Sequence, residues 1–393
     1  MILGASILQL TAIEKALEMG LQVIAVDMDP EAVGFKVPGV ICENISSTDT
    51  ENVLLAARRH EINGIMTLAS DKPMRTVAVV AKALGLPGIS PQTALNTTDK
   101  GQMRTVLKEH GVAVPEFYLV RSLAEYLDAV SKFEDSCIVK PVDNSGSRGV
   151  TLLLNSSSLD KKKEAYNYSK KYSDSGNILV EEYMQGPEVS VEAFSIDGVC
   201  YVIQITDKIT TGPPYFVEIG HNQPSSLPVV TKNEIKDLAG AAVKATGILE
   251  GPSHTEIKLT DSGPKIVELG ARLGGGFLAT HLVPLSTGVD LVDSCIRLAM
   301  GMNPDVAIKH DRGSAIRFLQ AEPGTIVGLE GIEEARKSEN VVQVHISHSV
   351  GDKSVVLKNG NDRIGSVIAR GETATEAIAS CERAQEKIKI IVK

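Results

Sequence analysis

The sequence predicts an α/β domain built on a parallel sheet, followed by α+β segments that end in a β-rich region. Residues 1 to about 90 alternate short apolar strands with helices, which is typical of βαβ units. The middle of the chain instead pairs strands across short turns, as antiparallel hairpins do. The last part is strand-rich with one final helix. We therefore expect three domains, at 1–90, at 91–303 with lobes of about 91–176 and 177–303, and at 304–393.

The composition is that of a soluble globular protein and gives no sign of a nucleic-acid or membrane partner. The 393 residues carry 40 Lys and Arg against 49 Asp and Glu, a net charge of −9, and no basic cluster is large enough for nucleic acid. No apolar run reaches the roughly 18 residues that a membrane span needs. The five cysteines form no CxxC pair, which argues against a zinc site and favours a reducing cytoplasm.

The N-terminal segment has the βαβ pattern without a dinucleotide fingerprint. A first strand at Ile2-Leu3 leads through Gly4-Ala5-Ser6 into a helix, and a strand at 64–68 ends at Ala69-Ser70-Asp71. The first turn does not complete a GxGxxG motif. Ligands bind at the carboxyl ends of parallel strands, so we expect a small-ligand or purely structural edge here.

A loop rich in serine and glycine is the most informative stretch for chemistry. The apolar strand 137–139 ends in Lys140-Pro141, and 150–154 is the second strand of a predicted hairpin. The loop between them consists of Ser145, Gly146, Ser147, Arg148 and Gly149. Its backbone N–H groups, hydroxyls and guanidinium would suit a polyphosphate. Taken alone, the pattern fits an ordinary surface hairpin equally well.

Two glutamates are predicted to face each other across a second hairpin, at about 253–269. Glu256 and Glu268 fall at opposing positions of its strands. Two facing carboxylates are unfavourable unless a cation lies between them, and Mg²⁺ takes such a pair together with phosphate oxygens. The alternative is that both glutamates are exposed and solvated.

Three basic residues complete this hypothetical Mg–nucleotide site. Lys100, at the start of a helix, and Lys140 would neutralise phosphates. Arg272, which follows the second glutamate by four residues, would stabilise charge in a transition state, or would simply pair with one of the glutamates.

Together these motifs resemble the ATP-grasp superfamily of carboxylate–amine ligases and its carboxylase relatives. The resemblance covers nearly the whole chain. The matching motifs are Asp99-Lys100, Ile138–Pro141, Ser145–Val150, Val180–Met184, Gly186-Pro187-Glu188, Glu256 and Glu268–Arg272. The resemblance implies an ATP-grasp fold preceded by a parallel-sheet domain and followed by a small β-rich domain. It also implies an ATP-dependent ligase that joins a small-molecule carboxylate to an amine, and it allows a homodimer.

The resemblance also assigns roles to single residues. Lys100 and Lys140 would contact the α- and β-phosphates, and the loop 145–149 would close over them as a lid. Glu256 and Glu268 would hold Mg²⁺, or Mn²⁺ in its place. The residues expected around the adenine are Glu181, Glu182, Tyr183 and Met184, and the residue expected at the ribose hydroxyls is Glu188. Arg272 would bind the substrate carboxylate or the acyl-phosphate.

The residues around Arg272 distinguish the branches of the superfamily. Many members have Asn where this chain has Gly270, so water or phosphate would replace a third protein ligand of the metal. Biotin carboxylases have a glutamate base shortly after the arginine, and Gly274-Gly275-Gly276 offers none, which disfavours bicarbonate chemistry.

The stretch from Glu268 to Gly275, with His221 upstream, most resembles the L-amino acid ligases, in which the matching His and Arg lie beside the substrates. A histidine in a polar loop is an equally good interpretation of His221. Amino-acid-like substrates are therefore expected. The alternatives are a purine-pathway enzyme of the phosphoribosylglycinamide synthetase kind, a carboxylase-like enzyme, and a nucleotide-binding relative without turnover.

Overall fold

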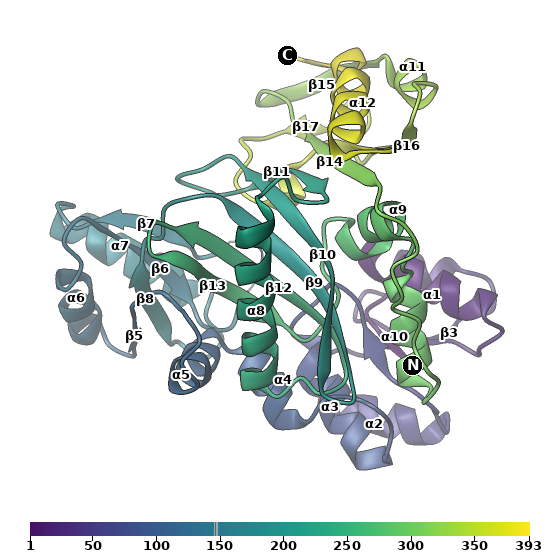
Figure 1. The fold of residues 1–393 in the computed structure, drawn as a ribbon, viewed down its shortest axis with the longest axis horizontal. Helices are drawn as coiled ribbons and strands as arrows, with labels where there is room; N and C mark the ends of the chain where they lie inside the picture. The colour runs from purple at the N-terminus through teal and green to yellow at the C-terminus, as the bar shows by residue number, and fades with distance from the viewer. Residues whose placement is uncertain (145, 147) are drawn as a thin grey trace.

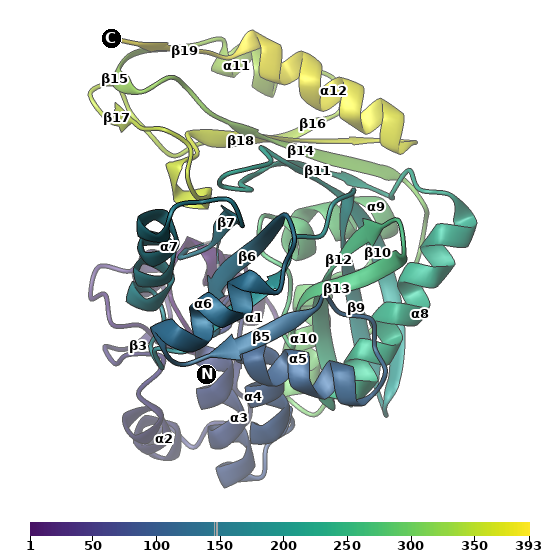
Figure 2. The ribbon, with the colours of Figure 1, turned by 90° about the vertical axis from the view of Figure 1, so that its left-hand side faces the viewer.

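The computed structural model of the chain describes residues 1–144, 146 and 148–393. Ser145 and Ser147, which the sequence assigns to the phosphate-binding loop, lie outside the described residues. Figures 1 and 2 show the C-terminal region at one end of the molecule, with the N-terminal sheet and the two middle lobes below it. Among the helices described, none is long and apolar enough to cross a membrane.

A four-stranded parallel sheet in the order β3–β2–β1–β4 forms the N-terminal domain. Its elements are β1 (Ile2–Leu3), α1 (Ile7–Glu18), β2 (Ile24–Val26), η1 (Val33–Lys36), β3 (Ile41–Glu43), α2 (Thr50–Arg59), β4 (Met66–Thr67) and α3 (Pro73–Leu84). Leu3, Val26, Val53 and Val77 form part of its buried core. The predicted βαβ organisation is confirmed.

Two consecutive helices, α4 (Pro91–Thr98) and α5 (Lys100–Glu109), follow the N-terminal domain. The Ser90 side chain accepts a hydrogen bond from the Thr93 N–H, and Pro91 occupies the first helical turn, where its missing donor costs nothing. Ser90-Pro91 would suit a turn or linker by sequence, and in the structure it starts a helix. Asp99 caps α5 in the same way through the Gln102 N–H, so Lys100 begins the helix as predicted.

The first lobe is a four-stranded antiparallel sheet in the order β5–β8–β6–β7. Its elements are β5 (Phe117–Val120), α6 (Leu123–Ser131), β6 (Ser136–Pro141), β7 (Thr151–Leu154), α7 (Leu159–Lys171) and β8 (Ile178–Glu182). Cys137 pairs with Leu153 and Val139 pairs with Thr151, so the predicted hairpin around the serine–glycine loop is confirmed.

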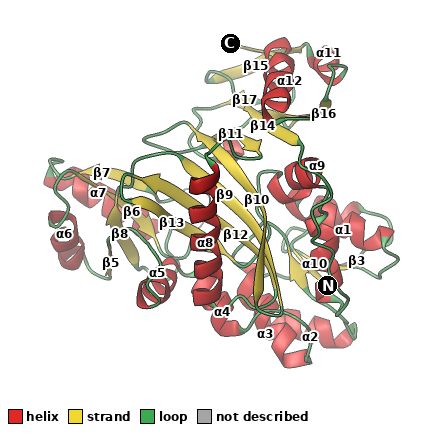
Figure 3. Cartoon of the chain, in the orientation of Figure 1, coloured by secondary structure: helices red, strands yellow, loops and turns green. Residues whose placement is uncertain are grey.

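An eight-stranded antiparallel sheet joins the second lobe to the C-terminal region, in the order β13–β12–β9–β10–β11–β14–β18–β16. The second lobe supplies β9 (Glu188–Ile196), β10 (Val199–Thr210), β11 (Glu218–Gln223), α8 (Val229–Thr246), β12 (Gly251–Thr260), β13 (Gly263–Gly270), η2 (Leu278–Leu282), α9 (Val283–Thr287) and α10 (Leu291–Ala299). Figure 3 shows α8 lying along one face of this sheet. The strand β11 was not predicted, and its discovery places His221 on a strand.

The C-terminal region continues the large sheet and adds a small one, in the order β17–β15–β19. Its elements are β14 (Gly313–Leu319), β15 (Gly324–Glu330), α11 (Ile332–Arg336), β16 (Val341–Ile346), β17 (Lys353–Ser354), η3 (Gly360–Asp362), β18 (Gly365–Gly371), α12 (Ala374–Lys387) and β19 (Lys389–Val392). Ala377 and Cys381 of α12 pack in one core with Val367 of β18. The predicted strand-rich end with one long last helix is confirmed.

A buried cluster of charges joins the two lobes. Arg104 on α5 donates to Glu181 on β8, with Nε at 2.6 Å from Oε1, and its Nη2 donates to the backbone oxygen of Val267 on β13 at 2.7 Å. Lys140 on β6 lies 2.5 Å from the other Glu181 oxygen. Burial alone would raise the pKa of Glu181, but the charges of Arg104 and Lys140 outweigh it and lower the pKa to about 2. The cluster therefore depends on an ionised Glu181.

Replacing Glu181 with Gln should destabilise the protein in a pH-dependent way. A carboxyl whose pKa is lowered by folding adds stability above its unfolded pKa, near 4.5, and loses it as the pH falls towards about 2. The lowered pKa corresponds to about 3 kcal/mol at neutral pH. Urea unfolding of both proteins between pH 7 and pH 3 should show a gap of that order at pH 7 that shrinks below about pH 4.5. Glu109→Gln, an exposed change on α5, is the control. A gap that is equal at all pH values would contradict the ionised cluster.

Candidate active site

The hairpin of β12 and β13 brings the two predicted glutamates together. Glu256 and Glu268 are direct cross-strand partners, as the sequence predicts, and the ladder shifts register just after Glu256. Each carboxylate has a lysine partner: the Glu256 oxygen lies 2.9 Å from Lys208 Nζ, and the Glu268 oxygen lies 2.8 Å from Lys100 Nζ. Burial would lower the pKa of Lys100, but the charge of Glu268 outweighs it and the pKa is raised. The charge of each facing carboxylate is therefore neutralised by one lysine.

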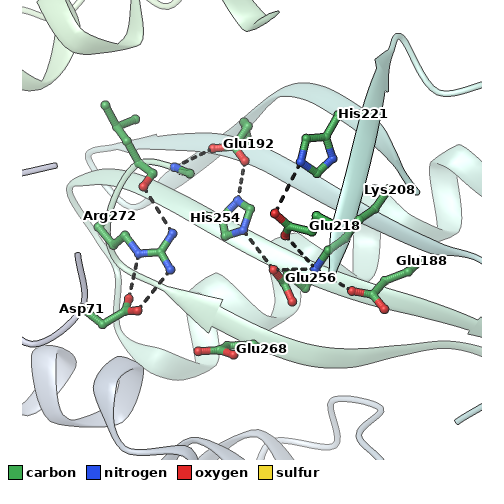
Figure 4. Close-up of polar contacts among 12 residues, drawn as sticks. Asp71, Glu188, Glu192, Lys208, Glu218, His221, His254, Glu256, Glu268 and Arg272 are labelled. Atoms are coloured by element: carbon green, nitrogen blue, oxygen red, sulfur yellow. Dashed lines mark hydrogen bonds and ion pairs between the residues drawn. The ribbon is translucent and has the colours of Figure 1, made fainter. Parts of the chain in front are cut away.

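Lys208 on β10 joins three carboxylates and was not singled out by sequence. Its Nζ lies 2.7 Å from Glu188, 2.9 Å from Glu256 and 3.3 Å from Glu218. The side chain is only 7% exposed, so these contacts are formed out of water. Burial would lower the pKa of Lys208, but the three carboxylate charges raise it well above its ordinary value. Lys208 thus connects the predicted ribose glutamate to a predicted metal glutamate (Figure 4).

A buried histidine–glutamate pair supports Glu256 from the other side (Figure 4). Nδ1 of His254 on β12 donates to Glu192 on β9, its cross-strand partner, and Nε2 lies 3.5 Å from Glu256 Oε1. Burial would lower the pKa of His254, but the charge of Glu192 and the hydrogen bonds of Glu192 and Glu256 raise it to about 9. The second Glu192 oxygen accepts from the Gly274 N–H at 3.1 Å. A side chain at 274 would collide with this pair, since an added Cβ would lie 2.5 Å from Glu192 Oε1.

Arg272 contacts a carboxylate of the N-terminal domain, not one of the glutamates. Its Nε and Nη2 donate to the two oxygens of Asp71, at 2.7 and 3.2 Å. Burial would raise the pKa of Asp71, but the charge of Arg272 lowers it. Gly270 makes room for this contact, because an added Cβ there would lie 3.1 Å from Asp71 Oδ1. The suggested pairing of Arg272 with Glu256 or Glu268 was wrong, since Asp71 takes both donors.

A cavity between the two lobes brings most of the predicted nucleotide residues together. The predicted residues that line it are Lys100, Lys140, Gly146, Arg148, Glu181, Glu182, Tyr183, Met184, Glu188, Glu256 and Glu268. Ile138, Val150, Phe216 and Val267 add apolar walls of the kind an adenine ring needs. Gly149, His221 and Arg272 are not among its lining residues. The cavity thus has an apolar part and, at Lys100, Glu256 and Glu268, a charged end.

His221 is fully buried, although a polar loop was an equal expectation. It lies on β11, its ring meets Phe318 edge-on, and within the described residues neither of its nitrogens has a hydrogen-bond partner. Nε2 lies 3.7 Å from Glu218 Oε2. The C-terminal region reaches the same point through Arg363, whose guanidinium stacks on Phe318 at 3.8 Å and donates to Glu218 at 3.2 Å.

Glu256 and Glu268 could coordinate a metal ion only together with a bound phosphate ligand. In the described part of the chain, no three His, Cys, Asp or Glu side chains are grouped as a metal site. Glu256 and Glu268 offer the hard oxygen donors that Mg²⁺ prefers, and phosphate oxygens and water would have to complete its coordination. The donor set therefore fits Mg²⁺ bound with a nucleotide.

Comparison with known proteins agrees with this geometry. The ATP-grasp domain family matches residues 133–281, and the family described as L-amino acid ligase C-terminal domain 2 matches residues 317–393. An L-arginine-specific L-amino acid ligase of Bacillus subtilis is 27% identical over 300 residues, covering 72% of this chain and 69% of the relative. A phosphoribosylamine–glycine ligase of Methanosarcina barkeri is 26% identical over 383 residues, covering 90% of this chain and 84% of the relative.

A solved structure extends the similarity to the whole chain. The crystal structure of an L-amino acid ligase from Bacillus licheniformis matches 100% of this chain and 98% of its own, with a TM-score of 0.86 and 25% identity. The fold and the lobes around the cavity thus define an ATP-grasp protein. The chain thus has an ATP-grasp domain and the C-terminal domain of the L-amino acid ligases, and its relatives are ATP-grasp ligases. The fold and ligase class expected from sequence are confirmed.

Sequence reasoning missed Asp71, Glu192, Lys208 and His254. A local signal exists for Glu192, because it is the single charge in the strand segment 189–196, where a charge needs a partner. Lys208 follows Asp207 directly and gives no such signal. His254 lies two residues before Glu256 and so shares its face of the strand. No local signal links Asp71 to Arg272, since 201 residues separate them.

Gly274→Ala should damage both stability and turnover. The added Cβ would meet Glu192 Oε1 at 2.5 Å and His254 Nδ1 at 2.8 Å, so the pair that supports Glu256 must move. We expect a loss of about 1–3 kcal/mol in the free energy of unfolding. Gly240→Ala on α8 is the matched control, because nothing lies within 4 Å of its added Cβ. It should be neutral or stabilising by up to ~1 kcal/mol. Equal stability and activity of the two variants in urea unfolding and turnover assays would refute the close packing at Gly274.

Proposed function

We propose that this protein uses ATP and Mg²⁺ to activate a carboxylate as an acyl-phosphate, which it then joins to the amine of a second, amino-acid-like substrate. The observation that carries the proposal is the facing pair Glu256 and Glu268, each neutralised by a lysine, in a cavity that also has apolar walls. The similarity to L-amino acid ligases supports the choice of substrates. The free cysteines and the need for ATP suit a reaction in the cytoplasm.

The nucleotide would lie with its adenine between the apolar walls and its phosphates towards Lys100 and Lys140. Both lysines now contact carboxylates, Glu268 and Glu181, and both line the cavity. Glu188, whose two oxygens lie 2.7 Å from Lys208 Nζ and 3.0 Å from Lys258 Nζ, would accept from the ribose hydroxyls. Glu256 and Glu268 would hold Mg²⁺, which when bound supplies positive charge next to the phosphate oxygens.

The protein's own part in the chemistry is to position groups and to neutralise charge. Lys100 and Lys140 compensate the charge of the phosphates as the carboxylate approaches the γ-phosphorus. Arg272, held by Asp71 and by the backbone oxygen of Leu273, would turn its remaining N–H groups to the carboxylate that becomes the acyl-phosphate. The amine then displaces phosphate from the acyl carbon.

A survey of substrates tests the proposal. The purified protein is incubated with ATP and Mg²⁺ and with mixtures of the common L-amino acids, and the release of ADP and phosphate is followed. A second set of reactions contains glycine and phosphoribosylamine, because a ligase of that kind is among the relatives. We expect ADP release that depends on amino acids. ATP binding without any substrate-dependent ADP would instead indicate a nucleotide-binding protein without turnover.

Glu268→Gln should abolish most turnover while the protein stays folded. The amide keeps the shape of the side chain but removes the charge that would hold the metal and that now pairs with Lys100. We expect turnover to fall by about 10²–10³-fold, with ADP binding in the absence of Mg²⁺ still measurable by calorimetry. Glu234→Gln, an exposed change on α8, serves as the control. Retained activity in the Glu268 variant would remove this residue from the metal site.

A further inference from the structure

A second cavity adjoins the nucleotide cavity and has no role in the proposal so far. It has a volume of about 320 Å³ and lies between the N-terminal domain and the first lobe. Lys100, Asn144 and Glu268 line both cavities. The Lys100–Glu268 ion pair, 2.8 Å long, therefore stands at the boundary of the two. A ligand in the second cavity would meet the charged end of the nucleotide cavity.

The residues that line this cavity are almost all of polar or charged type, with both signs of charge. Of the described residues that line it, five are threonines and one, Met103, is apolar. Lys72 and Arg75 supply positive charge on the side of α3, in addition to Lys100. The carboxylates are Asp71, Asp143, Asp174 and Glu268. A small ligand with an ammonium and a carboxylate group matches such a lining better than an apolar ligand or a simple anion.

Hydrogen bonds and ion pairs hold the positively charged side chains of Arg75 and Lys72 in place. Arg75 donates through Nε to the Thr98 hydroxyl at 2.7 Å, and its Nη2 lies 4.0 Å from Asp99, beyond hydrogen-bond range. Lys72 spans the gap to the first lobe, with Nζ 2.7 Å from Asp174. Arg75 is thus fixed by the hydrogen bond of Nε, and its two terminal nitrogens can still donate to a carboxylate.

Two of the four carboxylates, Asp71 and Glu268, lie towards the proposed reaction centre. Asp71 lines the cavity and also holds Arg272, which is the proposed contact of the acyl-phosphate. An ammonium between Asp71 and Glu268 would therefore lie close to the activated carbonyl. Asp71 lies two residues before α3 and Arg75 lies in the first turn of that helix, and both line the cavity.

We propose that this cavity binds the acceptor amino acid as a zwitterion, with its carboxylate on Arg75 and its amino group towards Asp71 and Glu268. The proposal rests on the ligase function proposed above and adds the place and the class of the second substrate. In the step that follows, the amine nitrogen forms a bond to the acyl carbon and the bond from that carbon to the phosphate oxygen breaks. Phosphate leaves with the electron pair, and of the three ammonium protons one stays on the amide, one goes to phosphate and one to solvent.

Hydroxylamine separates the two substrates experimentally. It traps an acyl-phosphate as a hydroxamate and so reports on ATP and the carboxylate donor without the acceptor. The probes are the pair of common L-amino acids that gives the fastest ADP release and, as a neutral analogue, the carboxamide of the acceptor. We expect Arg75→Ala to raise the KM for the acceptor about 10- to 100-fold. Hydroxamate formation should stay within about twofold of the unchanged protein.

The carboxamide gives a readout that a merely structural change would not move. The unchanged protein should use the acid in preference to the carboxamide, and Arg75→Ala should lose that preference while Arg75→Lys keeps part of it. Lys82→Ala, an exposed change on the same helix, should alter neither value. Thermal unfolding checks that each variant is folded.

Each other outcome has a distinct meaning. If the unchanged protein forms no hydroxamate, the acyl-phosphate route of the proposed function fails. If hydroxamate forms and Arg75→Ala instead raises the KM of the donor, the cavity binds the other substrate and this inference is overturned. Unchanged KM values for both substrates, or an undiminished preference for the acid, overturn it as well.

Discussion

The site depends on one constraint, which is that two carboxylates face each other across a hairpin and need positive charge between or beside them. Glu256 and Glu268 meet this need through Lys208 and Lys100. Much of the surrounding structure supports these two contacts. Lys208 is shared with Glu188 and Glu218, and His254 supports Glu256 through Glu192. Because phosphates and a metal ion bring their own charges, these ion pairs can be exchanged for ligand contacts without leaving a buried charge unpaired.

The same constraint explains why the N-terminal domain, the first lobe and the C-terminal region all contribute charged side chains to the site. The N-terminal domain contributes Asp71 to orient Arg272, and the first lobe contributes Lys140. The C-terminal region contributes Arg363, which holds Glu218 beside Lys208. The charges therefore converge from distant segments, and the directly contacting Asp71 and Arg272 alone are 201 residues apart. Most of them are largely buried, where a missing partner is costly, so the position of each domain is tied to the charge balance of the site.

Sequence reasoning succeeded where the chemistry is local. The facing glutamates follow from strand alternation and one short turn, and the loop after Lys140 follows from its glycines. It failed where a contact joins distant segments, as between Asp71 and Arg272, or where a strand is short and polar, as β11 is. It also missed α4, because Ser90-Pro91 is a turn signal and equally a helix start. Gly270 shows the difference. From sequence it was noted only because it stands where other members have an Asn metal ligand. That it leaves space for Asp71 could be seen only in the fold.

The central claim is that a carboxylate is activated by the γ-phosphoryl group at the Glu256–Glu268 site. The most direct measurement is the fate of oxygen-18 placed in the carboxylate of the donor substrate during turnover with ATP. An acyl-phosphate route transfers one labelled oxygen to each inorganic phosphate released, which is visible as a mass increase or an isotope shift in the phosphorus spectrum. Unlabelled phosphate would mean that water had attacked ATP, and label in AMP would mean an adenylate. Either result would contradict the account.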